Sequence, residues 1–504
     1  MLKITSPKEM AKLDAFYSNE VGIDEQILME NASFGVVNAI SNIKKVNLCT
    51  AKILIVCGVG NNGGDGLCVQ RLLKMRGTDS IAIIIGSESS FSRSVDRNLS
   101  INRKLGLDVT VIDDAEALCT FFEKNSFELI IDAIFGTGLN RIVDGIYKTA
   151  VELINKQSAY RLAIDIASGI DGDTGRTLGC CVNADETVAI QFIKRGHLLF
   201  PGREYTGKLV LAAICPQSGI ADSDFAERML EHGDIAKLLP HRKQNSNKGS
   251  YGKVLIIAGA KGMGGAALMC ARSAYAVGCG LVKVICHRDT VQYFSTLPEA
   301  MISAFDELDE ALDAVKKGIE WANTVAIGPG LGTDCSAIAK LLQTVLSSRK
   351  TAVIDADALN ALSVNRELLG LLHPNAILTP HPAEMSRICE CDTAQILNSP
   401  LYIAQSFSAT NRCTLLLKGA TSIIASHDGS ITYNTSGNSG LSKGGSGDTL
   451  TGIIASLAAQ GLNPYDSACL GAYLLGLSCE SATKALGERL VSNSMLEHFL
   501  NKQE

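Results

Sequence analysis

The chain has 504 residues, and one hydrophobic core rarely grows beyond about 250–300 residues, so two domains are predicted. A formal net charge of -6 provides no basic surface, which argues against nucleic acid as a partner. Hydrophobic residues make up 46% of the chain and glycine is frequent, which favours alternating strands and helices with tight connections over an all-β fold.

The sixteen cysteines are scattered along the chain, and many lie in apolar runs such as residues 54–57. With no C-x-x-C pair, we expect free buried thiols and no structural zinc. The first eight residues lack the apolar core of a secretory signal, and no apolar run of about 18 residues occurs. We therefore expect a cytoplasmic protein with no membrane partner.

Helices are predicted first along the chain. Ser6 followed by Pro7 marks a helix start, and Asp24 precedes apolar residues at helical spacing from Ile27 to Ile40. Short apolar strands follow, separated by helix-length segments, at residues 52–57, 80–85, 128–132 and 161–165. Such runs are typical of parallel strands covered on both faces, and ligands collect at the carboxyl ends of these strands.

Polar side chains follow several of these strands. Residues 58–66 form a glycine-rich turn that contains Asn61 and Asn62 and leads into a helix, while Asp132 and Asp165 end two other strands. The turn alone is common in dinucleotide-binding proteins, and the two aspartates alone could be strand-end caps. Together, these oxygen-bearing side chains suit a hard cation.

The apolar density then falls between Pro216 and Gly249, where a polar stretch at residues 241–248 separates the halves. We place the boundary near residue 225 and take residues 1–222 and 223–504 as the two domains. Further strands are predicted at residues 253–258, 281–285, 324–327, 352–355, 376–378 and 414–417. They indicate a second parallel α/β layer system.

The most informative tract is Gly444 to Asp448, which runs into an apolar helix. Glycines let backbone amides approach a phosphate, and the helix directs its positive N-terminal end at the same point. A helix cap needs only a short polar side chain, which Ser446 or Thr449 could supply, so Asp448 is a candidate base. The alternative is a glycine-rich turn with a cap.

Other loops at strand ends contribute further groups. A nucleotide phosphate can meet Lys418 and backbone amides, while a second substrate lies across His381 and Asp448. Taken alone, Lys418 could be a solvated charge, and His381, which lies between two prolines, could be a rigid-turn residue. Asp357 could be a magnesium ligand, but we favour a helix cap.

Five ordered motifs make residues 236–500 resemble the nucleotide-dependent NAD(P)H-hydrate dehydratases, a branch of the ribokinase-like fold. These motifs are residues 248–252, 328–332, 355–359, 378–384 and 444–452. The resemblance implies a three-layer domain in which Asp448 is the base, ADP or ATP binds with Mg²⁺, and Gly332, His381 and Asp448 contact the hydrated dinucleotide. It implies nucleotide binding by Lys418, Gly419, Ala420, Thr421, Ser422 and Gly447. Asn247 and Ser442–Lys443 depart from the family pattern, and Lys443 would add charge at the phosphate.

Residues 1–215 resemble the NAD(P)H-hydrate epimerases, which implies a Rossmann-like three-layer domain. The resemblance implies a K⁺ site at Asn62, Asp132 and Ser168, and it makes Asp165 and Lys194 the candidate acid–base pair. The implied substrate-binding residues are Asn61, Gly63, Gly64, Asp65, Gly136, Thr137, Gly138, Leu139, Asn140, Arg141, Ile142 and Asp165. Ala167 replaces the proline that is usual in the family's motif at residues 165–171.

The sequence therefore predicts an enzyme that repairs hydrated NADH and NADPH. The first domain would interconvert the R and S hydrates at C6, and the second would dehydrate the S hydrate at the expense of a nucleotide, with ADP as the donor if the chain is bacterial. One alternative is a ribokinase-like kinase of a small vitamin-type alcohol. Another is a catalytically inactive dinucleotide-binding regulator. We expect a homo-oligomer.

Overall fold

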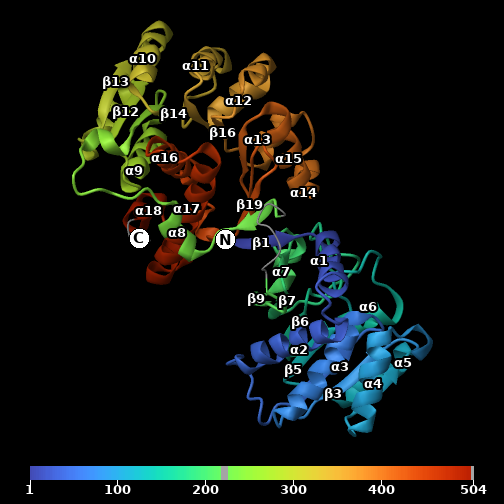
Figure 1. The fold of residues 1–504 in the computed structure, drawn as a ribbon. Coiled ribbons are helices and arrows are strands. Elements are labelled where there is room, and N and C mark those ends of the chain that lie inside the picture. The colour runs from blue at the N-terminus through green and yellow to red at the C-terminus, as the bar shows by residue number, and fades with distance from the viewer. Residues whose placement is uncertain (217–224, 501–504) are drawn as a thin grey trace. The chain divides into compact units, whose positions relative to one another are not determined.

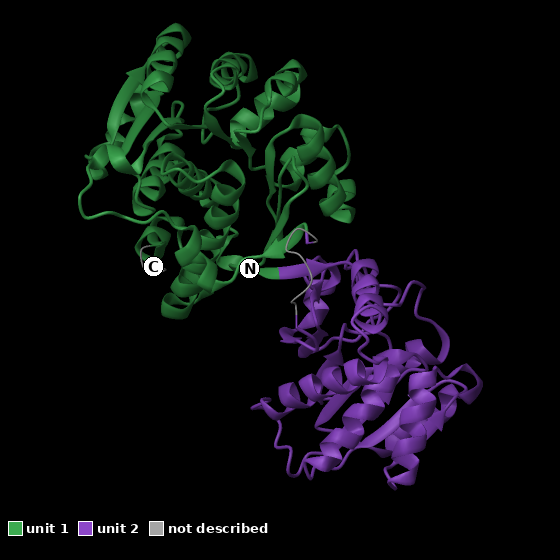
Figure 2. Ribbon diagram, viewed as in Figure 1, with its two compact units in different colours: residues 1–2, 226–504 green, residues 3–225 purple. Residues whose placement is uncertain are grey.

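The computed structural model describes residues 1–216 and 225–500. The chain divides into two compact units, residues 3–225 and residues 1–2 with 226–504 (Figure 2). The predicted boundary between residues 222 and 223 lies outside the described residues. The polar stretch at residues 241–248 falls inside the second unit, so the prediction that it separates the halves is wrong. Its exposed loop precedes β11 of that unit.

The unit of residues 3–225 is built on a seven-stranded sheet in the order β4-β3-β2-β5-β6-β7-β9 (Figure 1). All its strand pairs are parallel. The strands are β2 (Ile53–Cys57), β3 (Ile81–Ile85), β4 (Val109–Ile112), β5 (Leu129–Ala133), β6 (Tyr160–Ile164), β7 (Glu186–Ile190) and β9 (Lys208–Ala212). Two short strands, β1 (Leu2–Thr5) and β8 (Ile193–Lys194), also pair in parallel.

Helices cover both faces of this sheet. Alternate residues of β2 point to opposite sides: Ile53 and Ile55 pack with α2, α3 and α4, whereas Leu54 and Val56 pack with α5 and α6. The helices are α1 (Pro7–Asn19), α2 (Glu25–Ser41), α3 (Asn61–Met75), α4 (Arg93–Lys104), α5 (Ala115–Lys124), α6 (Gly145–Lys156) and α7 (Gly202–Thr206). The result is a three-layer unit with the carboxyl ends of its parallel strands along one edge.

The first two helix starts are confirmed. Ser6 caps α1, and its hydroxyl accepts a hydrogen bond from the Glu9 amide while the Glu9 carboxylate binds the Ser6 amide in return. Asp24 caps α2 by accepting from the Gln26 amide.

The second unit has a larger sheet in the order β13-β12-β11-β14-β15-β16-β17-β18-β19-β10. Its strand pairs are parallel except β17–β18 and β18–β19. The strands are β10 (Glu227–Met229), β11 (Lys253–Ile257), β12 (Leu281–His287), β13 (Met301–Phe305), β14 (Thr324–Ile327), β15 (Thr351–Ile354), β16 (Ala376–Leu378), β17 (Thr414–Leu417), β18 (Ser422–Ala425) and β19 (Ile431–Asn434).

Four helices, α9, α16, α17 and α18, pack against one face of this sheet in a single apolar cluster. The close approach of α16 to α9 needs a glycine, because a Cβ on Gly452 would lie 2.1 Å from the Cys270 carbonyl oxygen. The helices are α8 (His232–Leu238), α9 (Gly264–Ala276), α10 (Leu308–Trp321), α11 (Cys335–Ser347), α12 (Ala356–Val364), α13 (Pro382–Cys389), α14 (Thr393–Asn398), α15 (Pro400–Asn411), α16 (Ser446–Ala459), α17 (Pro464–Leu486) and α18 (Asn493–Leu500).

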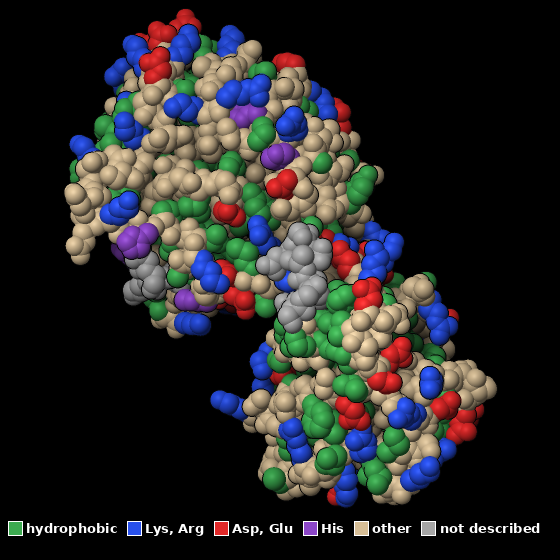
Figure 3. Space-filling view, viewed as in Figure 1, with side chains coloured by type: hydrophobic (Ala, Val, Ile, Leu, Met, Phe, Trp, Pro, Cys, Tyr) green, Lys and Arg blue, Asp and Glu red, His purple; other side chains and the backbone are tan. Residues whose placement is uncertain are grey.

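The predicted α/β fold class is confirmed for both units. The sixteen cysteines all carry free thiols. Among the helices of the described residues, none is both long and apolar enough to cross a membrane. On the face drawn in Figure 3, acidic and basic side chains are interspersed. The homo-oligomer stays a prediction.

Candidate functional site

The first candidate site begins where the predicted glycine-rich turn becomes helical. Helix α3 starts at Asn61, so Asn61 to Asp65 lie on its first turns rather than in a loop before it. The glycines are required by packing, since a Cβ on Gly63 would lie 1.9 Å from the Gly58 carbonyl oxygen. The helix can therefore begin directly against the end of β2.

The proposed acid–base pair forms a direct ion pair. Lys194 Nζ lies 2.5 Å from Asp165 Oδ1, with the side chains 1% and 13% exposed, and the ammonium also donates to the Ile190 carbonyl. Burial alone would raise the pKa of Asp165, but Lys194 and its hydrogen bond hold that pKa below the usual value. Asp165 adopts a left-handed backbone conformation with φ of 67° at the end of β6.

Two further carboxyl groups belong to this site. Burial, followed by the nearby charges of Asp165 and Asp14, raises the pKa of Asp65 well above its usual value. Asp14, on α1, was not predicted, and its pKa is raised to about 6 by desolvation in the groove, an effect that Lys194 partly offsets. The site thus combines one carboxylate whose pKa is lowered by Lys194 with two carboxyls whose pKa values are raised by burial.

Two of the three predicted potassium ligands, Asp132 and Ser168, are in direct contact. Ser168 Oγ donates to Asp132 Oδ1 over 2.6 Å, and the Ser168 amide donates to Asp132 Oδ2 over 2.8 Å. Asn62 lies nearby, with its amide nitrogen 3.4 Å from the Ile164 carbonyl. All three side chains are buried, and burial raises the pKa of Asp132 to about 6. Among the described residues there is no cluster of three or more His, Cys, Asp or Glu side chains that could hold a metal.

A groove of about 1230 Å³ is lined by Asp14, Asp65, Asp165 and Lys194. It is wide enough for a dinucleotide rather than a small metabolite alone. Of the predicted site residues, those that line it are Asn61, Asn62, Asp65, Gly136, Thr137, Gly138, Leu139, Asn140, Arg141, Asp165 and Lys194. Gly63, Gly64 and Ile142, and the predicted potassium ligands Asp132 and Ser168, are not among its described lining residues. The two glycines pack inside α3, and the Ile142 side chain is exposed.

The second candidate site centres on Lys418, just after β17. Lys418 Nζ lies 2.9 Å from Asp355 Oδ1 and 3.8 Å from Glu384 Oε2, so this lysine is not a solvated charge. Thr451 Oγ donates to the other Asp355 oxygen over 2.9 Å. Burial alone would raise the pKa of Asp355, but Lys418 and these hydrogen bonds hold it below the usual value. The carboxyl ends of β15 and β17 are thereby joined through charged groups.

Asp448 lies in the first turn of α16, beside this pair. The N-cap is Gly445 with φ of 97°, and it forms no side-chain cap bond, so Asp448 is not used as the cap. A Cβ on Gly447 would lie 3.4 Å from Lys418 Nζ, which places the start of α16 against the lysine. Burial, and then the charge of Asp355, raises the pKa of Asp448 to about 6. Asp448 is therefore a carboxylate that takes up a proton readily near neutral pH.

His381 and Glu384 form a capping box at the start of α13. The His381 amide donates to Glu384 Oε2 over 2.8 Å, and the Glu384 amide donates to His381 Nδ1 over 3.2 Å. Burial raises the pKa of Glu384, and burial with nearby Lys418 lowers that of His381. His381 is thus both a helix cap, as its position between prolines suggested, and a half-exposed group beside Lys418.

The favoured interpretation of Asp357 is wrong. The N-cap of α12 is Asp355, and Asp357 lies within the first turn, where its Oδ2 accepts a hydrogen bond from the Gly332 amide over 2.8 Å. The glycine loop adopts positive φ at Gly332, where φ is 89°. Asp357 therefore fixes the loop that follows β14.

The predicted nucleotide-binding residues 418–422 form the connection between β17 and β18. The Gly419 amide donates to Ser422 Oγ over 3.3 Å, which closes the turn. Lys443 does not contribute charge at the phosphate position: its ammonium donates to the carbonyl of Arg489 over 2.8 Å and to that of Val491.

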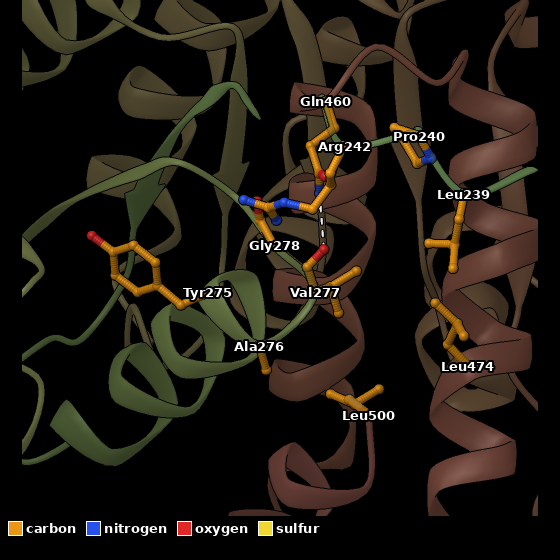
Figure 4. Close-up of a pocket in the computed structure, with 10 residues that line it drawn as sticks. All are labelled: Leu239, Pro240, Arg242, Tyr275, Ala276, Val277, Gly278, Gln460, Leu474 and Leu500. Carbon is orange, nitrogen blue, oxygen red and sulfur yellow. Dashed lines mark hydrogen bonds between the residues drawn. The ribbon is translucent and has the colours of Figure 1, made fainter. Parts of the chain in front are cut away.

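A separate hollow of about 200 Å³ lies in the same unit (Figure 4). Arg242 crosses it and donates to the Gly278 carbonyl over 3.1 Å, while apolar side chains such as Leu474 and Leu500 form its walls. None of the predicted site residues lines it. It belongs to the packing of α9 against α16 and α17 rather than to the candidate site.

Several residues of the two sites were missed from the sequence. Asp355 and Glu384 stand in quoted motifs but were given no role, although the spacing of His381 and Glu384 is a capping-box signal. Thr451 was hidden in an apolar helix. His197 lies three residues after Lys194 and accepts a hydrogen bond from the Lys194 amide. Asp14 had no local signal, because it reaches the groove only through the packing of α1.

Two protein-family profiles match the chain. One, described as NAD(P)H-hydrate dehydratase, matches residues 254–501, and the other, described as YjeF-related protein N-terminus, matches residues 25–196. A bifunctional NAD(P)H-hydrate repair enzyme of Moorella thermoacetica is 36% identical over 99% of this chain and 96% of its own length. One from Escherichia coli is 32% identical over 86% of this chain and 82% of its own length.

One similar solved structure is an ADP/ATP-dependent NAD(P)H-hydrate dehydratase from Bacillus subtilis, co-crystallised with ATP and Mg²⁺. It is 28% identical, covers 55% of this chain and 97% of its own, and has a TM-score of 0.48.

Proposed function

We propose, from the premise that this chain belongs to the family of bifunctional NAD(P)H-hydrate repair enzymes, that its two sites act in sequence on hydrated NADH and NADPH. The groove of residues 3–225 epimerises the hydrate at C6, and the site around Lys418 dehydrates the S hydrate with a nucleotide. The observation that carries the proposal is Asp448, a carboxylate with a raised pKa at a helix N-terminus beside the Lys418–Asp355 pair.

Dehydration requires that a poor leaving group be activated. Asp448 accepts the proton of the C6 hydroxyl as that oxygen attacks the terminal phosphoryl group of the nucleotide, and the amides at the start of α16 with Lys418 stabilise the charge that develops. The ring nitrogen lone pair then forms an N1–C6 double bond as the C6–O bond breaks and phosphate leaves. Loss of a proton from C5 converts this iminium ion into the C5–C6 double bond of the reduced ring. A proton is lost from Asp448, and the products are the reduced dinucleotide, phosphate and the shortened nucleotide.

Epimerisation requires that the C6 centre open and close again. Asp165, held ionised by Lys194, takes the proton of the C6 hydroxyl as the bond between N1 and C6 breaks, and the lysine ammonium supplies the proton to N1. Rotation about the C5–C6 bond presents the other face of the aldehyde carbon. Reversal of both proton transfers closes the ring with inverted C6.

A potassium ion fits the donor set of the first site. Asp132, Ser168 and Asn62 present carboxylate, hydroxyl and amide oxygens, which are hard ligands, and the buried Asp132 has a raised pKa that a cation would lower. Bound there, K⁺ would supply positive charge beside the dinucleotide loop after β5. These three residues would hold it.

At the second site, the chain fits a nucleotide that arrives with Mg²⁺. Glu384, a buried carboxylate whose Oε2 lies 3.8 Å from Lys418 Nζ, would hold the cation, which leaves Asp448 free to act as the base. The metal would neutralise phosphate charge during transfer. Lys418 to Ser422 and Gly447 would hold the nucleotide itself.

The test supplies each hydrate separately. The S hydrate with ADP or ATP is expected to give reduced dinucleotide at once, whereas the R hydrate is expected to give it only through epimerisation. A phosphorylated product that accumulates without elimination would support the alternative, a kinase of a small alcohol. Binding without turnover by either site would support the alternative of an inactive regulator.

A further inference from the structure

One buried histidine bonds the backbones of both members of the proposed acid–base pair. His197 lies in the short 3₁₀ turn Arg195–His197 after β8 and is 1% exposed. Its Nδ1 lies 3.0 Å from the Lys194 amide nitrogen, and its Nε2 lies 2.7 Å from the Asp165 carbonyl oxygen. The ring therefore links β8 to the end of β6. Lys194 and Asp165, which it joins, are 29 residues apart in the chain.

These partners fix the protonation state of the ring. A backbone amide can only donate and a carbonyl oxygen can only accept, so Nδ1 must be an acceptor and Nε2 must carry the proton. Only the neutral ring with hydrogen on Nε2 makes both bonds. Burial, with the nearby charge of Lys194, lowers the pKa of His197 to about 4, which agrees with a neutral ring.

The two bonds act where the backbone is under strain. Asp165 has φ of 67°, a left-handed conformation that residues with a side chain rarely adopt unless their surroundings impose it. The Asp165 amide donates to the Val188 carbonyl over 2.9 Å, and its carbonyl accepts from His197, so both backbone groups are held. The direction of the Asp165 side chain follows from this backbone, because the left-handed conformation turns the carboxylate toward Lys194.

We propose that His197 is a positioning residue that sets the carboxylate of Asp165 against the ammonium of Lys194 for epimerisation. This proposal rests on the proposed role of the pair. It goes beyond that role by assigning the geometry of the pair to a third side chain that does not line the groove. A histidine that only fills the core would support folding without affecting turnover by the folded enzyme.

The test uses the full chain and its two activities. In H197L both hydrogen bonds are lost, and kcat for epimerisation of the R hydrate is expected to fall about 10- to 100-fold, since small misplacements of reacting groups have effects of this order. The KM for the hydrate is expected to stay within about twofold, because no groove contact is removed. Dehydration of the S hydrate by the same preparation is expected to be unchanged.

H197N keeps the test decisive where H197L fails to fold. Its side chain can still accept from the Lys194 amide but is too short to reach the Asp165 carbonyl, so its kcat is expected to lie between those of wild type and H197L. The matched control is T187V, which removes a buried bond of 2.6 Å from Thr187 Oγ to the Thr206 carbonyl in the same unit. It is expected to lower thermal stability and leave epimerisation unchanged.

Three results separate the possible failures. Wild-type epimerisation by folded H197L or H197N, together with an inactive D165N, would overturn the positioning role and leave the pair intact. Wild-type epimerisation by D165N would overturn the proposed pair itself. A loss in H197N matched by an equal loss in T187V would also contradict the positioning role, since both would then report stability alone.

Discussion

Each unit contains a lysine–aspartate pair at the carboxyl edge of its sheet, but only the pair of the first unit includes the proposed catalytic base. In the first unit, Asp165 is itself the proposed base, and contact with Lys194 holds its pKa low. In the second, Lys418 binds Asp355, and the proposed base Asp448 stands beside the pair with its pKa raised to about 6. The same architecture thus lowers the pKa of one proposed catalytic carboxylate, Asp165, and raises the pKa of the other, Asp448, toward neutral pH.

The largest expected effect comes from a substitution that should abolish one activity and leave the other intact. Asp448→Asn should lower dehydration about 100- to 10,000-fold, because the base is lost, while dinucleotide binding and epimerisation persist. Phosphate release and recovery of reduced dinucleotide measure the first activity, and loss of the R hydrate measures the second. The matched control is Asp313→Asn, which changes an exposed side chain of α10. Dehydration at the wild-type rate would remove Asp448 from the mechanism.

Asp165→Asn should do the reverse. Epimerisation is expected to fall about 100-fold or more, and leaving Lys194 buried without its partner should destabilise this unit by about 3–5 kcal/mol. Dehydration of the S hydrate should be retained, and it reports that the second unit is folded. Chemical denaturation followed by a probe in each unit measures the stability change. Equal loss of both activities would contradict the division of roles.

The pH dependence sharpens the contrast between the two carboxylates. Asp448 acts as a base only when ionised, and its pKa of about 6 is raised by burial and by Asp355, so dehydration should fall about tenfold per pH unit below 6. Asp165, with its lowered pKa, stays ionised through this window, so the carboxylate needed for epimerisation persists. Initial rates of both reactions from pH 5 to 8 test this. A flat dehydration profile would contradict the assigned base.

Asp132→Asn addresses the cation site of the first unit. Removing the charge should weaken the dependence of epimerisation on K⁺ about tenfold or more, because the buried carboxylate is the only charged group among the three ligands. Titration of the reaction with KCl at constant ionic strength is the measurement, with exposed Asp113→Asn as control. Superimposable titrations for wild type and variant would count against potassium at this site.

The smallest expected effect concerns Lys443. Because its ammonium binds the carbonyls of Arg489 and Val491 rather than facing Lys418, Lys443→Ala should leave the KM for the nucleotide within about twofold. It should lower the free energy of unfolding by about 1 kcal/mol through the lost hydrogen bonds. A large rise in KM would show that the side chain reorients toward the phosphate.

Much of the fold could be predicted because most central strands are continuous apolar runs. Strands such as β2, β14, β16 and β17 were placed within a residue of their ends. Strand β4 was missed because it is only partly buried at the sheet edge, and the hairpin strands β18 and β19 were missed because they lie among polar residues. Strand β7 was also missed, although four of its five residues are buried, so local pattern finds uninterrupted apolar runs and loses buried strands that carry polar residues.

The residues of the candidate sites also fall into those that the sequence indicates and those that only tertiary contacts reveal. Asp165, Asp448 and Lys418 stand at strand or helix ends, where sequence order indicates convergence, whereas Lys194 was predicted only from the family resemblance. His197 and Asp14 were missed because their roles arise from tertiary contact: one bonds two separate backbones, and the other reaches the groove across a helix. Asp357 was misassigned because a first-turn carboxylate can serve its own helix or a neighbouring loop, and only packing decides.

The most direct test of the central claim measures how much inorganic phosphate is released for each reduced dinucleotide recovered. Purified protein is given pure S hydrate and either ADP or ATP, and inorganic phosphate is measured against recovered reduced dinucleotide. One phosphate released for each dinucleotide recovered is the predicted result, with both lost in Asp448→Asn. Recovery without phosphate, or a stable phosphorylated dinucleotide, would contradict a mechanism in which transfer to the hydroxyl drives elimination.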